Sequence, residues 1–421
     1  MNASGATGPA SLWRHADFLK LWAAQSVSSL GARITREGLP FAAVMSLGAT
    51  PAQVGILAAL ARGPAIVVGL AGGGFGDRSR RRPVLIGSDI GRALVLASIP
   101  IAAWTHLLAM TQIYIVAAFV GALNVLFDIA DHAYLPSLIA REQLVDGNSK
   151  LAVTESLAEI GGPALYGVLF QFLTAPIAIA VNAGTYLFSA CALATIHSRE
   201  PAVERSAGRD RANFITDFRT GIGAAIGDPP VRWLLVMATA NALFGAFFSA
   251  LYIVFAVRTL HLSAAMLGAT VAVGGAAALV GAGLAGRVIR RFGLGRSFVV
   301  TAVIASAGSV FVPLAHGAPV VGMGMLIASQ LIGDSFGTIT EIAGRSLRQS
   351  LVAPQLMGRV GGVFAVAPGV TGIIGALLGG WLGGAIGPQH TLLIATAGLT
   401  LAASIGLFSP LLRVSGDDLA R

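Results

Sequence analysis

Three charged residues, Arg33, Arg36 and Glu37, lie near the middle of an apolar stretch long enough to cross a membrane. Insertion scales put the cost of such a residue at mid-membrane at about 2.5 to 3.5 kcal/mol, so these groups should face a wet cavity or pair. We expect Arg62, in the next apolar stretch, to be the external partner of Glu37. Exchange of that partner for a proton can couple protons to a conformational change, whereas a static pair that fixes packing is an equally supported alternative.

A second polar group lies in the fourth apolar stretch, where Asp128 and Asp131 are three residues apart and share a helix face. Neighbouring carboxylates favour holding a proton, which suits proton uptake. Solvation or capping at the end of the helix is the alternative, which we slightly favour. Further candidates for cavity hydrogen bonds or proton coupling are Asn124, Asn241, Tyr252, Asp334 and Glu341.

The composition is that of a membrane protein. Of 421 residues, 55% are hydrophobic and 11% are charged, against about 25% charged in soluble domains. The net charge of +9 comes from basic residues in short gaps between apolar runs, which argues against nucleic-acid binding. The single cysteine, Cys191, excludes an internal disulfide and a cysteine-based metal site.

Enzymatic chemistry finds no support in the sequence. It contains no Gly-Lys-Ser/Thr phosphate loop, no histidine pair at metal-binding spacing and no nucleophile with a base at plausible spacing. We therefore expect neither an enzyme nor a bound cofactor or metal. Residues 1–17 have no apolar core, so no cleaved signal peptide is expected.

Twelve apolar runs approach the roughly 20 residues that a spanning helix needs. They predict an all-α membrane protein with two six-helix bundles, residues 18–196 and 231–412, joined by a cytoplasmic linker at 197–230 and flanked by cytoplasmic segments 1–17 and 413–421. The predicted spans are 18–46, 54–76, 84–105, 112–137, 151–173, 176–196, 231–257, 264–286, 298–315, 319–340, 361–386 and 390–412.

Basic residues gather in the loops on one side of these spans, and the short loops on the other side hold only Arg258. Under the positive-inside rule this places both termini in the cytoplasm. The linker repeats Phe214, Phe218, Ile222 and Ile226 at helical spacing. This pattern predicts a short amphipathic helix, either on the inner membrane face or as an ordinary soluble linker helix.

The basic loop after the second span reads Gly73-Gly-Phe-Gly-Asp77-Arg78-Ser-Arg-Arg81-Arg82. The amino terminus of the eleventh span lies on the same side and would stabilise the Asp77 carboxylate. Glycines at four-residue spacing would let the two helices touch: Gly69, Gly73 and Gly76 on one, and Gly375, Gly379, Gly383 and Gly387 on the other. The hypothesis is a conformational latch formed by Gly73, Asp77, Arg78, Arg81 and Arg82; the alternative is a loop that serves only topology.

The two halves repeat weakly. Residues 137–144 and 350–356 are similar at an offset of 213 residues, and duplicated bundles form their sites between the halves near the bilayer midplane. Glu155 and Glu159 fall in the first turns of the predicted fifth span, where acids stabilise a helix start.

With twelve spans, a cytoplasmic midpoint loop and the pattern from Gly73 to Arg82, the chain resembles the major facilitator superfamily. Leu12 to Phe18, Phe127-Asp128 and Gly162-Pro163 resemble its branch of macrolide-efflux and enterobactin-export proteins. The resemblance implies that Gly162, Pro163 and Gly167 belong to a motif of exporters in helix five. That motif would act as a hinge, or equally as a packing kink.

The sequence therefore predicts a secondary transporter of the inner membrane. It would export a small amphipathic organic molecule by alternating access, use the proton gradient, need no cofactor and work as a monomer in the lipid bilayer. The direction comes from the resemblance alone, so an importer remains an alternative. A different class, a non-transporting sensor or docking protein, would use the basic linker as its partner surface.

Overall fold

The computed structural model describes residues 12–72, 80–198 and 211–414, and in these ranges the chain is built from helices. Three latch residues, Gly73, Asp77 and Arg78, lie outside the described residues. The helices are α1 (Ala16–Leu47), α2 (Pro51–Gly72), α3 (Arg81–Trp104), α4 (Met110–Leu138), α5 (Leu144–Phe172), α6 (Ala175–Ala194), α7 (Arg211–Gly227), α8 (Pro229–Arg258), α9 (Ala264–Phe292), α10 (Leu294–Gly308), α11 (Phe311–Leu314), α12 (Pro319–Leu351), α13 (Met357–Ala385) and α14 (Pro388–Ile405).

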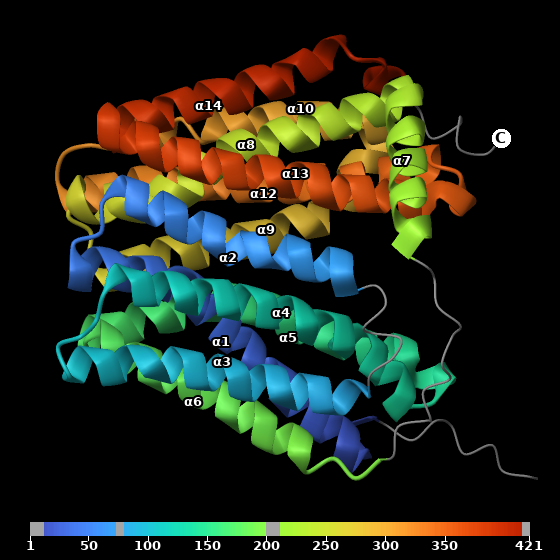
Figure 1. Cartoon of the computed structure of the whole chain (residues 1–421). Helices are drawn as coiled ribbons and strands as arrows, with labels where there is room; N and C mark the ends of the chain where they lie inside the picture. The colour runs from blue at the N-terminus through green and yellow to red at the C-terminus, as the bar shows by residue number, and fades with distance from the viewer. Residues whose placement is uncertain (1–11, 73–79, 199–210, 415–421) are drawn as a thin grey trace, which may run out of the picture.

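Ten stretches of the described residues are long and apolar enough to cross a membrane. Helices α1 and α5 are not among the ten, although they have 32 and 29 residues and lie side by side with the others (Figure 1). Each carries several charged residues in its interior. These charged groups need partners or water within the bundle.

The helices run between two ends of the molecule, seen at the right and left of Figure 1. We call the right end, where α7 lies, the α7 end, and the opposite end, with the tight turns at 48–50 and 259–263, the loop end. Two helices extend well beyond the apolar spans predicted for them. Helix α5 begins at Leu144, ahead of the span predicted from 151, and α12 continues to Leu351, past the span predicted to end at 340.

The internal repeat extends over most of the helices, well beyond the short sequence match that indicated it. Five helices of the first half (α1–α6) begin 213 residues before a counterpart in the second half (α8–α14); the paired first residues are Ala16 and Pro229, Pro51 and Ala264, Arg81 and Leu294, Leu144 and Met357, and Ala175 and Pro388. Residues 213 apart therefore occupy equivalent places in the two halves.

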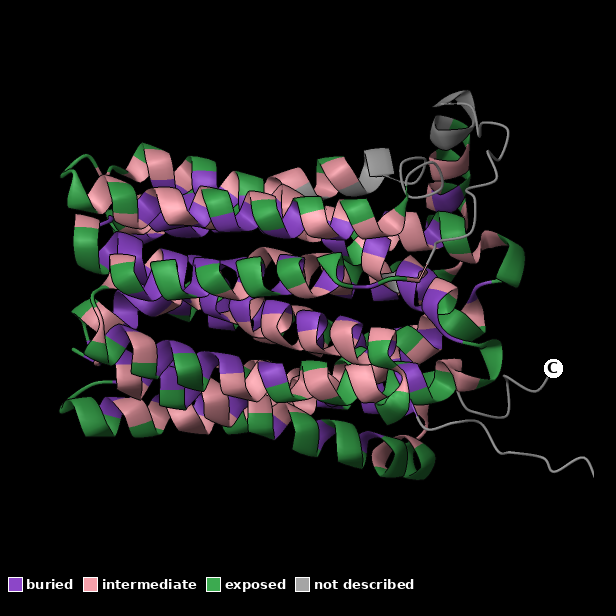
Figure 2. Ribbon diagram, turned by 90° about the horizontal axis from the view of Figure 1, so that it is seen from below, coloured by how far each residue is buried: buried purple, intermediate pink, exposed green. Residues whose placement is uncertain are grey.

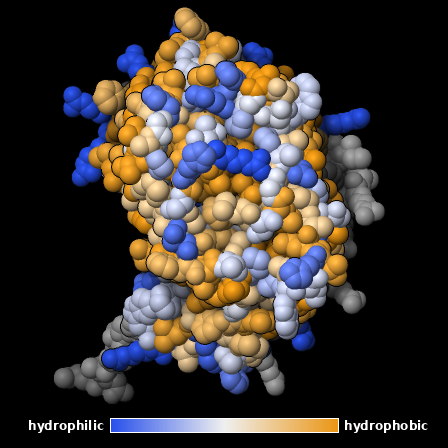
Figure 3. All heavy atoms as spheres, turned by 90° about the vertical axis from the view of Figure 1, so that its left-hand side faces the viewer, coloured by the Kyte–Doolittle hydropathy of each residue, from blue (hydrophilic) through white to orange (hydrophobic). Residues whose placement is uncertain are grey.

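Buried residues line the inward faces of the helices, and exposed residues cover the outside of the molecule (Figure 2). The outer surface includes large apolar side chains such as Trp104, Phe172 and Phe408. A soluble protein rarely exposes so much apolar surface, whereas lipid-facing helices require it. Figure 3 looks onto the loop end, where hydrophilic residues gather in patches among apolar ones.

The halves meet most tightly at the loop end. A Cβ on Gly55 of α2 would lie 2.5 Å from Ala376 O of α13, and a Cβ on Gly167 of α5 would lie 2.9 Å from Gly268 Cα of α9. The contact is looser farther along α2, since a Cβ on Gly63 would meet only the tip of Ile373, at 3.9 Å. Glycine thus allows backbone contact at the loop end, and the two helices move apart from there.

The linker helix predicted from the sequence is α7, which lies across the α7 end of the molecule (Figure 1). Phe218, Ile222 and Ala225 pack against Val360 and Val363 of α13, so this part of its apolar face is covered by protein. Asp217 adds an ion pair to Arg359 Nε at 2.8 Å. The helix is therefore attached to the second half.

Candidate functional site

A cavity of about 440 Å³ lies among α1 to α5 and reaches α8. Its lining combines small apolar side chains with charged and hydrogen-bonding groups, and we call it the central cavity. The polar groups on its wall are Ser28, Ser29, Arg33, Thr35, Arg36, Arg62, Arg92, Asn124, Asp128, Glu155 and Ser249. Ser249 comes from the second half, so the cavity spans the boundary between the halves.

Charged residues of α1 and α5 meet beside this cavity in what we call the α1–α5 ion-pair network. Glu159 bridges two arginines, with Oε2 2.5 Å from Arg33 Nη2 and Oε1 3.0 Å from Arg36 Nη2. Arg36 Nε also lies 3.1 Å from Glu37 Oε1, and Glu155 is farther from Arg33, at 3.8 Å. Mutual pairing lowers the cost of holding these charges at membrane depth.

The prediction that Glu155 and Glu159 stabilise a helix start was wrong. Because α5 begins at Leu144, both acids lie in the helix interior and pair with α1. Gly162 makes this approach possible: a Cβ there would lie 2.4 Å from Arg33 Cβ. The expected pairing of charges within the span holding Arg33, Arg36 and Glu37 is confirmed for Arg36 and Glu37.

Arg62 is not the partner of Glu37, which corrects the pairing expected from the sequence. The Glu37 carboxylate turns to its chain neighbour Arg36. Arg62 Nη1 instead donates a hydrogen bond of 3.0 Å to Ser249 Oγ on α8 and forms no ion pair with any described residue. It therefore connects the two halves across the central cavity.

A second charged pair, Asp89 and Arg92 of α3, was missed in the sequence. Arg92 Nη2 lies 2.5 Å from Asp89 Oδ1, and the exposed fractions of the two side chains are 3% and 0%. The guanidinium lies 4.3 Å from the ring centre of Phe127 and 4.5 Å from that of Tyr186. An Asp-x-x-Arg spacing inside an apolar run is the signal that could have revealed this pair.

The polar residues predicted on α4 have different surroundings. Asn124 Oδ1 accepts a 2.9 Å hydrogen bond from Arg92 Nη1, Asp128 is exposed on the cavity wall, and Asp131 accepts one from Gln25 of α1. Asp128 and Asp131 thus occupy separate environments.

The second half contains an open cavity of its own, of about 580 Å³, among α8, α10, α12, α13 and α14, which we call the second-half cavity. Asn241 and Glu341 line it, and Glu341 pairs with Arg345. Asp334 instead lies against α9, where a Cβ on Gly274 would be 2.3 Å from its Oδ2. The structure therefore does not bring these three residues to one site.

The family model of the Major Facilitator Superfamily matches residues 21–376. The chain belongs to this superfamily. Two similar relatives are the uncharacterized MFS-type transporter YfiS of Bacillus subtilis (strain 168), 25% identical over 92% of both chains, and the multidrug efflux pump Tap of Mycolicibacterium fortuitum, 25% identical over 83% of this chain and 85% of the pump.

Solved structures of transporters have the same fold as this chain. The nucleoside transporter NupG has a TM-score of 0.77 at 12% identity and covers 93% of this chain and 98% of its own. A bacterial homologue of the iron transporter ferroportin, in an inward-facing state, has a TM-score of 0.75 at 16% identity, with coverage of 93% and 98%. The protein is thus an all-α membrane transporter.

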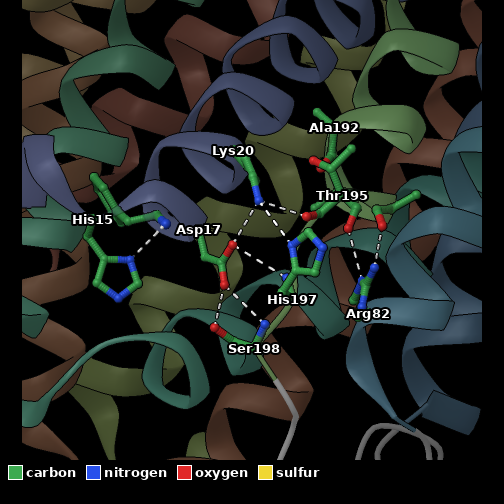
Figure 4. A network of polar contacts seen from close by, with 11 residues as sticks. His15, Asp17, Lys20, Arg82, Ala192, Thr195, His197 and Ser198 are labelled. Carbon is green, nitrogen blue, oxygen red and sulfur yellow. Dashed lines mark hydrogen bonds and ion pairs between the residues drawn. The ribbon is translucent and has the colours of Figure 1, made fainter.

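In this transporter the described end of the predicted latch loop contacts the first half. Arg82 Nε and Nη2 donate to the carbonyls of Leu193 and Ala194 at the end of α6, at 2.9 and 2.5 Å (Figure 4). Arg81 begins α3. The glycine ridge predicted to face α2 packs mainly on α8, since a Cβ on Gly375 would lie 2.0 Å from Leu243 O and one on Gly379 would lie 2.8 Å from Phe247 Cα.

Figure 4 shows the polar network that surrounds Arg82 at the α7 end. Asp17, before the span predicted from residue 18, accepts hydrogen bonds from Ser198 Oγ and Lys20 Nζ at 2.5 and 3.0 Å. Burial opposes ionisation of Asp17, but these bonds and two from backbone amides outweigh it and hold its pKa below the usual range. The network ties the start of α1 to the end of α6.

The Gly162-Pro163-Gly167 motif lies within a continuous α5. Gly162 packs on α1 and Gly167 on α9, so the motif places α5 against both a helix of its own half and one of the other. This gives the motif a packing role, and the hinge stays a prediction.

Proposed function

We propose that the protein exports a small amphipathic organic molecule across the cell inner membrane in exchange for protons, by alternating access. The polar central cavity beneath a tightly packed loop end is the observation that carries the proposal. We further propose a monomer with both termini in the cytoplasm and no bound cofactor. The basic loops that the positive-inside rule assigns to the cytoplasm support this orientation.

In that orientation the loop end faces outward and the structure is an inward-facing state. Backbone contacts of Gly55 with α13 and of Gly167 with α9 close the outer end. Arg258 adds a hydrogen bond of 2.8 Å to Ala49 O across the same end. These contacts must separate when the cavity opens outward, which requires α2 and α5 to move relative to α13 and α9.

Glu159 is the residue we assign to proton coupling. It holds two arginines of α1 from α5, and α5 also forms the closed contact with α9. Protonation would remove its charge and weaken both ion pairs. The state of this carboxylate is therefore linked mechanically to a helix that must move during the cycle.

Support for export of an organic cargo comes from the relative Tap, which is a multidrug efflux pump. The central cavity has an apolar wall containing Leu39, Leu57 and Val120 beside its charged groups. Such a lining suits a molecule with apolar and polar parts.

The proposal is tested with purified protein in liposomes and the dye Hoechst 33342 as the cargo. In vesicles selected for one orientation, an imposed proton gradient should drive the dye against its own gradient and opposite to the protons. A protonophore should remove this flux. Flux that is unchanged by the protonophore would disprove proton coupling, and movement in the same direction as the protons would disprove exchange.

A further inference from the structure

The second-half cavity occupies the place where the first half has its buried Arg92 cluster. In the first half this space holds Arg92, which contacts Asp89, Asn124, Phe127 and Tyr186, and the cluster forms part of the wall of the central cavity. The residues 213 positions later are Ala302, Ala305, Gly337, Thr340 and Leu399, and each of the five lines the second-half cavity.

Smaller side chains explain why the space is hollow. A charged pair is replaced by two alanines, asparagine by glycine, and two aromatic rings by threonine and leucine. A Cβ on Gly337 would meet nothing within 4 Å, so no neighbour has moved in to fill the gap. The resulting cavity of about 580 Å³ falls within the range of small-molecule sites.

The lining has two chemical parts. Leu234, Met237, Phe298 and Leu399 form an apolar body, and Glu341, Arg345 and Arg348 lie on α12 toward the α7 end. Glu341 pairs with Arg345. Arg348 lies 5.1 Å from the ring centre of Phe364 and has no ion-pair partner among the described residues, so it presents a positive charge to this part of the wall.

We propose that the second-half cavity binds the apolar body of an amphipathic organic anion whose acidic group pairs with Arg348. The site lies inside the second half and is separate from the central cavity, which α1 to α5 surround. It depends neither on the direction of transport nor on proton coupling. A molecule held there would brace α10, α12 and α14 as the Arg92 cluster braces α3, α4 and α6.

The binding experiment uses the full chain in lipid nanodiscs and two fluorescent probes. Dansylglycine has an apolar ring system and a carboxylate, and dansylamide has the same rings without the charge. Both should show saturable fluorescence enhancement above that of empty nanodiscs. Dansylglycine should bind about fivefold more tightly, because an ion pair of this kind contributes roughly 1 kcal/mol.

Four variants locate the probe. Ala305→Phe fills the cavity and should weaken the binding of both probes at least about tenfold, because the new phenyl ring takes the space that the dansyl rings need. Val300→Phe adds the same ring to the exposed face of α10 and should change neither. Arg348→Gln should remove only the preference for dansylglycine, and Arg62→Gln in the central cavity should leave both affinities unchanged.

Several outcomes would overturn the proposal. They are absence of saturable binding, equal loss in Ala305→Phe and Val300→Phe, and loss in Arg62→Gln. If Ala305→Phe fails to fold, Arg348→Gln still decides, because an unchanged preference for dansylglycine excludes the assigned charge pair. Failure of dye export in liposomes would leave these results standing.

Discussion

The two halves have the same helix frame but fill it with different chemistry. Where α1 meets α5, charged residues pair across the interface. At the equivalent interface of α8 and α13 the charges are missing. Ala246, Ser249 and Gly372 stand 213 residues after Arg33, Arg36 and Glu159, in the same places. There a Cβ on Gly375 would lie 2.0 Å from Leu243 O, so backbones touch where the first half uses ion pairs.

The same contrast recurs at the α7 end. Arg82 of α3 reaches the carbonyls at the end of α6, whereas its counterpart, Gly295 of α10, lies so close to the chain after α14 that a Cβ would be 1.7 Å from Leu411 O. At these two interfaces the first half therefore uses polar groups that a proton or ligand can change. The second half uses close backbone packing there.

The largest effect is expected for Arg92→Ala, which places alanine at the first-half position equivalent to Ala305 of the second half. Removal of one member of a buried pair leaves an uncompensated charge and should destabilise the protein by about 3 to 5 kcal/mol. Thermal unfolding in detergent measures this loss.

The double variant Asp89→Ala with Arg92→Ala reproduces both alanines of the second half. It should be less destabilised than Arg92→Ala alone, because no unpaired carboxylate remains. Equal or greater loss in the double variant would show that packing against Phe127 and Tyr186, rather than charge, explains the contribution of Arg92.

Gly380→Leu tests the closed loop end, where a Cβ on Gly380 would lie 2.8 Å from Pro51 O and 2.9 Å from Gly55 Cα. The added side chain should separate α2 from α13 at a cost of about 1 to 3 kcal/mol in the closed state. A cysteine at Ser249, in a Cys191→Ala background, should then react several times faster with an impermeant maleimide added from the loop end.

The matched control is Gly384→Leu, because a Cβ on Gly384 meets nothing within 4 Å. Its labelling rate should equal that of the parent. Equal labelling of both leucine variants would contradict a glycine-dependent closure of this end.

Glu159→Gln tests whether the charged interface of the first half is the mobile one. Loss of the bridging carboxylate leaves Arg33 and Arg36 without their shared partner. Since the groups are partly solvated, the substitution should destabilise the α1–α5 ion-pair network by about 1 to 2 kcal/mol. Proton-driven flux should then fall roughly 5- to 30-fold. Glu155→Gln is the control, because that side chain is 69% exposed and 3.8 Å from Arg33. Similar losses in both variants would remove the special role of Glu159.

The sequence was informative where a pattern is local. Apolar runs predicted the spanning helices, and the spacing of Phe218 and Ile222 predicted α7. The match of residues 137–144 to 350–356 found the correct offset, because both segments follow the same helix end. These features depend on neighbours along the chain, which the sequence shows directly.

Pairing between helices was predicted less well. The partner predicted for Glu37 was wrong because the rotation of each helix about its own axis, and not only depth in the membrane, decides which charges meet. Asp89 and Arg92 were missed because no charge cluster marks them within α3. The second-half cavity corresponds to the replacement of those two residues by Ala302 and Ala305, and small side chains in an apolar helix carry no local signal of a cavity.

Arg82→Ala is the mildest test of the contrast between the halves. It removes two charge-assisted hydrogen bonds to the carbonyls that end α6, where a positive charge also interacts favourably with the helix dipole. Because the site is partly solvated, the expected loss is about 1 kcal/mol, seen as a small fall in unfolding temperature. Arg80→Ala, at an exposed arginine two residues earlier, should have no measurable effect. Equal effects of the two variants would mean that net positive charge near α6, rather than the hydrogen bonds of Arg82, stabilises this end of the first half.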